Sequence, residues 1–318
     1  MGYTNEEILE ILKDVPLKNL DIPLTEGAII LEGGAFRGVY QEGVLDCLLE
    51  NGILFDTAIG VSAGALNGIN YLAGQQGRSF HINIRYRHDK KYVGVNVFIK
   101  SRMRGFIGFD YVFGKLPNIS DLDMAKIKQD DRKLIAVVSN METGKAEYLD
   151  SKRDDILECV KASATLPYIS RPVKIGGKHY LDGGCCDRVP YKYALDNGYK
   201  NIVVIRTRDK EYRTVSDHEK KLKMAKRFYS KYKDFTKKFA NSDLEYNETC
   251  DDLERLAKEK RVFVIYPSVP LHVKMLEGDL NKLKDLYMLG YYDAKKNLKA
   301  LKGYLNRKDK NDMNDSAN

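Results

Sequence analysis

Several patterns that mark common classes of protein are missing from this sequence. The cysteines are odd in number and have no C-x-x-C spacing, which argues against a disulfide framework and against a zinc site. The five histidines form no H-E-x-x-H or H-x-H cluster, so no two imidazoles are set to share a metal ion. We therefore expect reduced thiols and no bound metal. The cysteines are Cys47, Cys159, Cys185, Cys186 and Cys250.

Long hydrophobic stretches are also missing. No run approaches the ~18 apolar residues that cross a bilayer, and no N-terminal segment has the layout of a signal peptide. We therefore expect a cytoplasmic protein. The net charge of +8 suits nucleic acid, anionic lipid or mere solubility, because net charge informs association rather than fold. No nucleic-acid-binding motif accompanies it, so no nucleic-acid partner is expected, and the oligomeric state is left open.

What the sequence does contain is a repeated order of strand, turn and helix. An apolar segment at 28–31 enters Gly33-Gly34, and apolar residues then recur at helical spacing up to Asn51-Gly52. A second strand at 53–59, a turn at 60–64 and a helix at 65–72 follow. Strands that alternate with helices predict an α/β sheet. Further strands are expected at 134–138, 173–175, 178–181, 202–205 and 262–265, and helices at 5–14, 153–162, 191–197, 217–239, 243–259 and 276–303.

The second turn has the sequence Gly60-Val61-Ser62-Ala63-Gly64. Between a strand and a helix, such a G-x-S-x-G turn lifts a serine hydroxyl off the sheet, and small neighbours avoid clashes. The helix N-terminus also favours developing negative charge. Alone the motif is weak, because Ser62 could simply cap a helix between two turn glycines. Its setting favours a nucleophile at Ser62.

The first turn, Glu32-Gly33-Gly34-Ala35-Phe36-Arg37-Gly38, is rich in glycine, which lets backbone N–H groups face an anion. It lacks both nucleotide signatures: Ala35 replaces the second glycine of the dinucleotide fingerprint, and no Lys-Ser/Thr follows Gly38. The remaining chemical use is an oxyanion hole with donors from Gly33, Gly34 or Gly38. Arg37 either belongs to this loop or is a structural surface charge.

A third motif, Leu181-Asp182-Gly183-Gly184, follows a predicted strand pair. An Asp before two glycines is commonly only a turn, but a carboxylate within hydrogen-bond reach of a serine could accept its proton directly. The alternative is a Ser-Asp-His triad, because His218 and His272 follow Asp182 in the required order. Neither histidine has a partner signature, so a two-residue site is preferred.

In this order and spacing the three motifs resemble the patatin-like phospholipase family, which carries a Gly-rich Arg-Gly loop, a G-x-S-x-G elbow and a D-G-G or D-G-A motif. The resemblance extends to Ala-Ser-Ala-Thr-Leu-Pro at 162–167 and covers roughly residues 29–207. Within the family, the chain looks most like the bacterial branch with a helical, Lys-rich C-terminal extension.

The resemblance implies a three-layer α/β/α sandwich with a mixed, mainly parallel sheet, plus C-terminal helices. It implies a serine acyl hydrolase that needs no histidine, metal or organic cofactor and cleaves lipid or fatty acyl esters through an acyl-enzyme. The family often has glycine where this chain has Ala35, which puts the donors of the loop in question. The implied site comprises Ser62 as nucleophile, Asp182 as general base, Gly33, Gly34, Arg37 and Gly38 in the oxyanion loop, Gly60 and Gly64 in the elbow, and Gly183 and Gly184 beside the base.

The composition becomes Lys-rich and helical after about residue 207. We divide the chain into a helical lead-in at 1–26, the catalytic domain at 27–207, a basic helical extension at 208–305 that packs on the core, and a polar tail at 306–318. The predicted helix at 217–239 has an aromatic stripe opposite a basic face. It either packs on the core, which is preferred, or lies on an anionic membrane, and a non-catalytic lipid-binding protein stays an alternative.

A second basic region runs from Arg78 to Arg104 and includes aromatic residues. It follows the predicted helix of the nucleophile. We expect part of this region, with Arg102 and Arg104, to flank the mouth of the active site and attract anionic head groups. The alternative for most of its members is a solvated loop or helix face.

Overall fold

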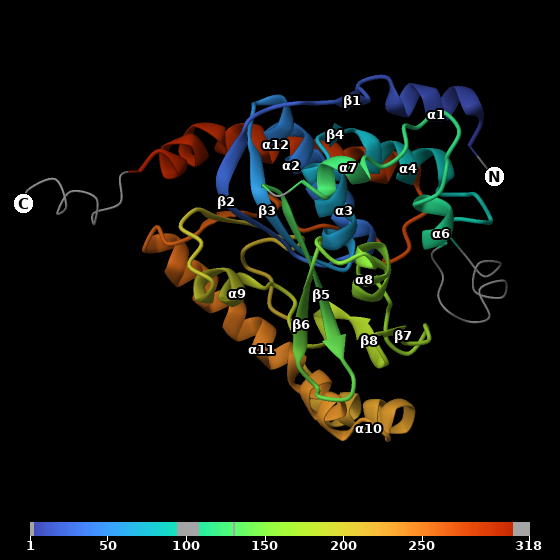
Figure 1. Ribbon diagram of the computed structural model, residues 1–318, viewed down its shortest axis with the longest axis vertical. Helices are drawn as coiled ribbons and strands as arrows, with labels where there is room; N and C mark the ends of the chain where they lie inside the picture. Colours follow the sequence, from blue (N-terminus) through green and yellow to red (C-terminus); the bar gives the residue numbers. More distant parts are fainter. Residues whose placement is uncertain (1–2, 94–107, 130, 308–318) are drawn as a thin grey trace, which may run out of the picture.

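A mixed sheet organises the computed structural model, which describes residues 3–93, 108–129 and 131–307 (Figure 1). Its strand order is β10-β9-β2-β3-β5-β8-β7, and β6 pairs with β5. The run from β10 to β5 is parallel, whereas β6, β8 and β7 are antiparallel. The strands are β2 (Leu24–Leu31), β3 (Leu54–Val61), β5 (Lys133–Asn140), β6 (Ala146–Asp150), β7 (Val173–Ile175), β8 (Lys178–Asp182), β9 (Ile202–Ile205) and β10 (Phe263–Ile265).

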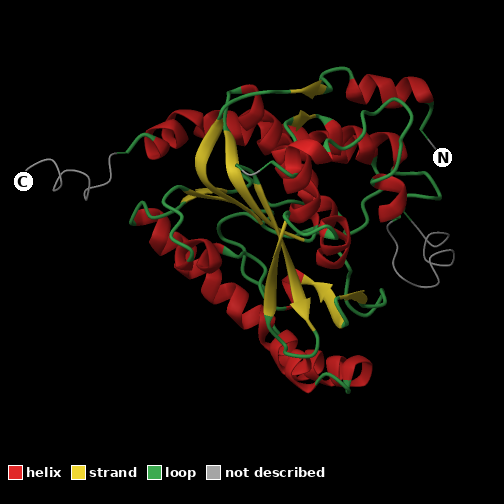
Figure 2. Cartoon of the chain, viewed as in Figure 1, coloured by secondary structure: helices red, strands yellow, loops and turns green. Residues whose placement is uncertain are grey.

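Helices cover both faces of this sheet (Figure 2). Alternate residues of β2 enter two separate cores. Ile29 and Leu31 pack with α2 (Gly38–Glu50), α3 (Ala63–Leu72) and α12 (Leu280–Leu305). Ala28 and Ile30 pack with α9 (Tyr191–Asp196) and α11 (Lys233–Lys258). Parallel strands covered on both faces are apolar at consecutive positions, which is why residues 28–31 are all fully buried. The predicted mixed, mainly parallel α/β/α fold with C-terminal helices is therefore confirmed.

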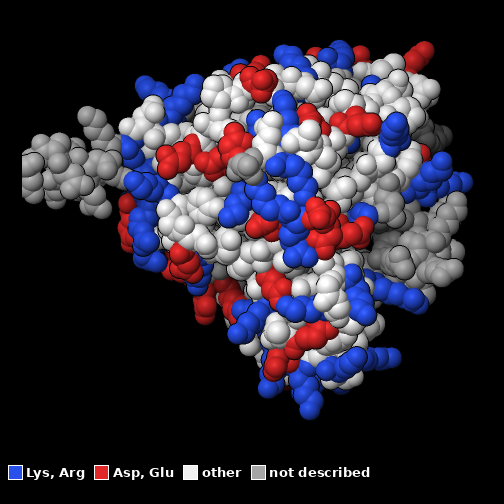
Figure 3. Space-filling view, in the orientation of Figure 1, with Lys and Arg blue, Asp and Glu red and all other residues white. Residues whose placement is uncertain are grey.

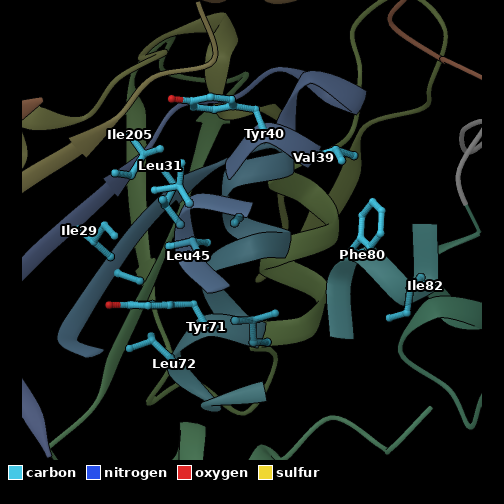
Figure 4. Close-up of a cluster of buried hydrophobic side chains, with 14 of the residues drawn as sticks. Ile29, Leu31, Val39, Tyr40, Leu45, Tyr71, Leu72, Phe80, Ile82 and Ile205 are labelled. Atoms are coloured by element: carbon cyan, nitrogen blue, oxygen red, sulfur yellow. The ribbon is translucent and has the colours of Figure 1, made fainter. Parts of the chain in front are cut away.

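The larger of these two cores lies between the sheet and a layer of helices that includes α2, α3 and α12 (Figure 4). A polar group buried in this core is hydrogen bonded within it. The Tyr71 hydroxyl accepts a hydrogen bond from Phe55 N–H and donates one to the Ile53 carbonyl. The helices are α1 (Asn5–Leu12), α2 (Gly38–Glu50), α3 (Ala63–Leu72), α4 (Arg78–Tyr86), α6 (Phe109–Val112), α7 (Met124–Ile127), α8 (Ile156–Ser163), α9 (Tyr191–Asp196), α10 (His218–Tyr229), α11 (Lys233–Lys258) and α12 (Leu280–Leu305). Short β1 (Lys18–Asn19) and β4 (Gln75–Gln76) form a separate pair, and 3₁₀ turns occupy Ala35–Arg37 and Gly183–Cys185.

The predicted boundary between the helices at 217–239 and 243–259 is wrong. The chain breaks at 230–232, between α10 and α11, and α11 then continues through the expected gap. The break lets Tyr229 and Phe235 enter one small core, with ring centroids 5.4 Å apart. The Thr236 hydroxyl bonds the Tyr229 carbonyl left over at the end of α10. Ser242, which lies in the expected gap at 240–242, is buried and accepts hydrogen bonds from Arg188 and Lys221.

Strand β6 and helix α4 were not predicted. All five residues of β6 are only half-buried, so the strand has neither the continuous apolar run nor the alternation that identifies strands in a sequence. Helix α4 begins at Arg78, which is buried at 1% exposure and bonds Asn70 and the Ser120 carbonyl. Arg78 is thus a structural residue, not a solvated or head-group-binding one. Positions 94–107, with Arg102 and Arg104, lie outside the described residues.

Helix α12 crosses α2 at a close contact between two glycines. A Cβ on Gly43 of α2 would lie 1.9 Å from the Tyr287 carbonyl oxygen, and a Cβ on Gly290 of α12 would lie 1.9 Å from the Tyr40 carbonyl oxygen. The Tyr287 hydroxyl also donates to Asp46 of α2, at 2.7 Å. The last helix is therefore part of the same core as the first strands, whereas the division at residue 207 stays a prediction. In the described part of the chain, no helix combines the length and apolar character needed to cross a bilayer.

We expect Gly290→Ala to lower the free energy of unfolding by about 1–3 kcal/mol, because the added methyl must push two backbones apart. Gly303, in the same helix, has open space around its Cβ position. Gly303→Ala should therefore stabilise the protein by up to about 1 kcal/mol through helix propensity alone. Urea unfolding of both variants tests the pair, and equal effects would contradict the close crossing.

Candidate active site

Ser62 lies in a strained turn between β3 and α3. Its backbone has φ 56° and ψ −122°, a left-handed conformation that costs a non-glycine residue about 1–3 kcal/mol. A Cβ on Gly60 would lie 2.5 Å from Ala65 N, and one on Gly64 would lie 2.3 Å from the Leu31 carbonyl oxygen. The Ser62 side chain makes no capping hydrogen bond to α3. The turn therefore holds the hydroxyl away from the helix, which removes the simple capping interpretation.

The register of the sheet brings Asp182 to this hydroxyl. Val61 of β3 is opposite Val137 of β5, and Val138 of β5 is opposite Asp182 of β8. Ser62 and Asp182 therefore meet across β5, and the Ser62 hydroxyl lies close enough to lower the pKa of Asp182. Because β8 runs antiparallel to β5, this meeting depends on a hairpin return that the spacing of the motifs does not specify.

Burial raises the pKa of Asp182 to about 6. The nearby Ser62 hydroxyl and a hydrogen bond from Gly184 N–H, the latter at 2.8 Å, oppose this rise, as does the charge of Arg188. Gly183 has no space for a side chain, since its Cβ would lie 2.2 Å from the Val137 carbonyl oxygen. Asp182 is thus a buried carboxylate with a raised affinity for protons, held against a serine hydroxyl.

Two residues that sequence reasoning did not single out hold the two backbones in place. Ser163 Oγ accepts from Ser62 N–H at 2.9 Å and donates to the Val137 carbonyl at 2.6 Å. The Thr165 carbonyl accepts from Asp182 N–H at 2.9 Å. Both residues belong to the segment 162–167, so the resemblance over that segment was the signal that could have identified them.

The glycine-rich loop packs directly against the elbow. A Cβ on Gly33 would lie 3.2 Å from Ser62 Cβ, one on Gly34 2.8 Å from Thr207 Oγ1, and one on Gly38 2.8 Å from Ala63 Cβ. The Gly38 N–H bonds the carbonyls of Ala35 and Phe36 within the 3₁₀ turn. No hydrogen-bond acceptor for the N–H groups of Gly33 and Gly34 is present among the described residues. Of the three predicted donors, Gly33 and Gly34 are the two available to a substrate oxygen.

Ala35 stands in the place where the family often has glycine, and its backbone has φ 48°. That conformation favours glycine, so the chain keeps the loop geometry at the cost of strain. The loop is anchored by its first residue: Glu32 accepts from Arg206 at 2.9 Å, Tyr246 at 2.6 Å and Thr207 N–H at 2.6 Å. Although burial raises the pKa of Glu32, these donors hold it below the usual value. The ion pair joins β2 to β9 and α11.

Ser62 opens onto two hollows. One, of about 750 Å³, is mainly apolar and includes Phe36, Leu66 and Ile82. The other, of about 830 Å³, is the more polar of the two and includes Gly33, Gly34 and Asp182, with three arginines, Arg37, Arg188 and Arg208; we call it the polar hollow. The site can therefore hold an apolar group on one side of the hydroxyl and a polar group on the other.

The triad alternative finds no support in the geometry. Neither His218 nor His272 lines either hollow, and within the described residues neither bonds Asp182, whose side chain accepts from Gly184 N–H and lies near the Ser62 hydroxyl. His218 begins α10 and His272 is exposed on the connection to α12. Across residues 3–93, 108–129 and 131–307, no group of three or more His, Cys, Asp or Glu side chains could hold a metal ion.

Comparisons with family models and with known proteins found several matches. Residues 29–195, more than half of the chain, match the family model described as patatin-like phospholipase, and residues 232–306 match a domain of unknown function (DUF6363). The uncharacterized protein YjjU of Escherichia coli is 26% identical over 83% of this chain and 74% of that protein. The lysophospholipase NTE1 of Lodderomyces elongisporus is 22% identical over 88% of this chain, which spans only 20% of that protein. VipD from Legionella pneumophila is 13% identical, with a TM-score of 0.43 over 90% of this chain and 70% of that chain.

Replacing Asp182 by Asn should stabilise the protein in a pH-dependent way. With a pKa of about 6 when folded and about 3.9 when unfolded, Asp182 contributes stability below pH 4 that is lost as the pH rises through 6. Relative to the wild type, Asp182→Asn should gain nothing at pH 4 and up to about 3 kcal/mol at pH 7. Urea unfolding across this range measures the difference. Asp251→Asn, at an exposed position, is the control substitution. If the stability difference between Asp182→Asn and the wild type did not change with pH, the result would contradict a raised pKa at Asp182.

Proposed function

The chain belongs to the patatin-like phospholipase family, and we propose that it is a serine acyl hydrolase that cleaves fatty acyl esters with Ser62 as nucleophile and Asp182 as general base. Membership of the family supports a lipid-acting hydrolase in general. The observation that carries the finer proposal is the strand register, which places Ser62, at a left-handed turn between strand and helix, beside Asp182, a buried carboxyl group of raised pKa.

In the proposed reaction Ser62 Oγ attacks the ester carbonyl carbon while its proton moves to Asp182. The Gly33 and Gly34 N–H groups donate to the oxyanion, an interaction that typically contributes a few kcal/mol to the transition state. The alcohol leaves with the proton held by Asp182, and an acyl-enzyme remains. Water then attacks the acyl carbon, gives a proton to Asp182, and the fatty acid departs as Ser62 regains its hydrogen.

The two hollows suggest how an ester would lie across Ser62. The apolar hollow suits the acyl chain and the polar hollow suits the alcohol part. Among the described residues no carboxylate pairs with Arg37 or Arg208, whereas Arg188 pairs with Asp243. Burial and the neighbouring Arg208 lower the pKa of Arg37, and its Nε has no partner. We therefore propose that the alcohol part carries an anion such as a phosphate ester, which would relieve the repulsion between the two guanidinium groups.

Contact with an anionic membrane is a second proposal, which one surface favours. The aromatic stripe predicted for 217–239 mostly faces inward, because Ala225 is buried in the same small core as Tyr229 and Phe235. Two apolar side chains of α10 remain outside, Met224 at 43% and Phe228 at 55% exposure. Helix α10 lies at the lower end of the molecule (Figure 1), where Lys and Arg side chains project (Figure 3). Exposed apolar residues within a basic face are typical of helices that lie on anionic lipid.

Labelling with a fluorophosphonate probe tests the nucleophile. We expect the probe to modify Ser62, and Ser62→Ala to lose the label and lower kcat by about 10³-fold or more. Activity should fall below about pH 6, because a protonated Asp182 cannot accept a proton. His218→Ala and His272→Ala serve as controls and should keep wild-type activity. Ester hydrolysis that survives Ser62→Ala would sink the proposal.

Arg208→Ala tests the polar hollow. A lysophospholipid and a monoacylglycerol with the same acyl chain differ only in the phosphate-bearing head group. We expect kcat/KM to fall about 10- to 100-fold for the lysophospholipid, as for loss of a hydrogen bond to a charged group, and less than about threefold for the monoacylglycerol. Arg213→Ala is the control variant. Arg213 pairs with Asp251 and Glu254 and does not line the hollow. An equal loss for both substrates would show that Arg208 does not recognise the phosphate.

A further inference from the structure

The mainly apolar hollow beside Ser62 contains an unexpected polar cluster. Its lining includes Glu42 of α2, Asn83 of α4 and Tyr92. Gly38, at the start of α2, contacts the nucleophile elbow, and Glu42 follows it by one helical turn, a rise of about 6 Å. Carboxyl groups are almost never buried unless paired. A carboxyl at this depth in an acyl-binding hollow therefore requires an explanation.

The three side chains form a short hydrogen-bonded chain. The Tyr92 hydroxyl donates to Asn83 Oδ1, and Asn83 Nδ2 donates to Glu42 Oε1 at 2.7 Å. Glu42 Oε2 is buried and has no partner among the described residues. Other amides of the same hollow are tied to the protein: Asn67 Nδ2 donates to the Gly38 carbonyl at 2.9 Å, and Asn70 Oδ1 accepts from Arg78 at 2.7 Å. Glu42 thus has one oxygen fixed and one left over.

The unpartnered Glu42 Oε2 acts as a hydrogen-bond donor when the carboxyl is protonated. Burial and the nearby charge of Asp46 raise the pKa of Glu42 well above its usual value, against a smaller opposite effect from Asn83. These effects favour the neutral, protonated form of the carboxyl. Because Asn83 already donates to Oε1, the proton lies on Oε2. A buried donor without an acceptor is destabilising, and leucine at this position would avoid that cost.

We propose that Glu42 donates this hydrogen bond to an oxygen atom on the acyl chain of the substrate, so that the hollow selects acyl groups bearing a hydroxyl or keto oxygen over plain hydrocarbon chains. The inference rests on the proposed function, because it takes Ser62 as the point where the acyl carbonyl is held. One helical turn from Gly38 to Glu42 places the oxygen roughly four to seven carbons from the carbonyl. Glu42 would be a specificity-determining residue and would take no part in bond cleavage.

The test compares 4-nitrophenyl octanoate with its derivatives hydroxylated at carbon 6, 7 or 8, from which the hydroxyl cannot close a five- or six-membered lactone. The readout is the specificity ratio, defined as kcat/KM for a hydroxylated ester divided by kcat/KM for octanoate. In the wild type the ratio should exceed one at one or two adjacent positions. Glu42→Leu should lower that peak ratio about tenfold, since the substrate hydroxyl would then be buried without a partner. Glu42→Gln, which keeps an N–H donor, should retain most of it.

Glu50→Leu is the matched control, because Glu50 also belongs to α2 but is exposed, does not line the hollow and does not contribute to the raised pKa of Glu42. It should leave the ratio within twofold of the wild type. A ratio unchanged in Glu42→Leu, or a wild type that prefers octanoate at every position, would overturn the inference.

A second measurement separates this inference from the proposed chemistry. Ligand-detected NMR with Ser62→Ala can compare binding of octanoic acid and its hydroxylated forms without any turnover. Preferential binding of one hydroxylated acid, lost in Ser62→Ala combined with Glu42→Leu, supports the role of Glu42 even if no ester is cleaved. Equal binding of all the acids would overturn that role while leaving the nucleophile assignment intact.

Discussion

The left-handed backbone of Ser62 is the constraint on which the rest of the site depends. A non-glycine residue keeps that conformation only when its surroundings over-determine it, and here they do so from every side. Ser163 Oγ takes the Ser62 N–H, and Gly60 and Gly64 allow β3 and α3 to meet without room for another side chain. Gly33 and Gly38 bring the preceding loop into contact with the same turn. The glycine-rich composition of both motifs thus follows from one crowded turn.

Buried charge is handled in two different ways around this turn. Glu32 and Arg206 are almost fully buried but paired, and further donors satisfy the remaining lone pairs of the carboxylate. This is the arrangement in which a buried pair is tolerated. Arg37 and Glu42, which line the hollows on either side of Ser62, each keep a buried polar atom without a partner. The Glu32–Arg206 pair thus supports the scaffold, whereas Arg37 and Glu42 belong to the lining of space that a substrate would fill.

The sequence predicted the parallel part of the sheet well, because buried strands and tight turns leave local signals, whereas the roles of the site residues stay predictions. Apolar runs such as residues 28–31 identify strands buried on both faces, and glycine spacing identified the two turns. The break at 230–232 has no glycine or proline to announce it and arises from the packing of Tyr229 and Phe235. The meeting of Ser62 with Asp182 depends on strand register across β5, and the unpaired oxygen of Glu42 depends on the position of α4. Such tertiary relations are not written in any short segment.

The contact between Gly43 and Gly290 links the order of synthesis to the order of folding. Helix α2 is made early, yet the helix that covers it is made after every other described element. Domains generally fold from the N-terminus as the chain emerges, but here the apolar surface of α2 must wait, exposed, for its cover. Contacts between residues this far apart in sequence also slow folding. A nascent chain of this protein would therefore be a natural client for chaperones until its last helix has docked.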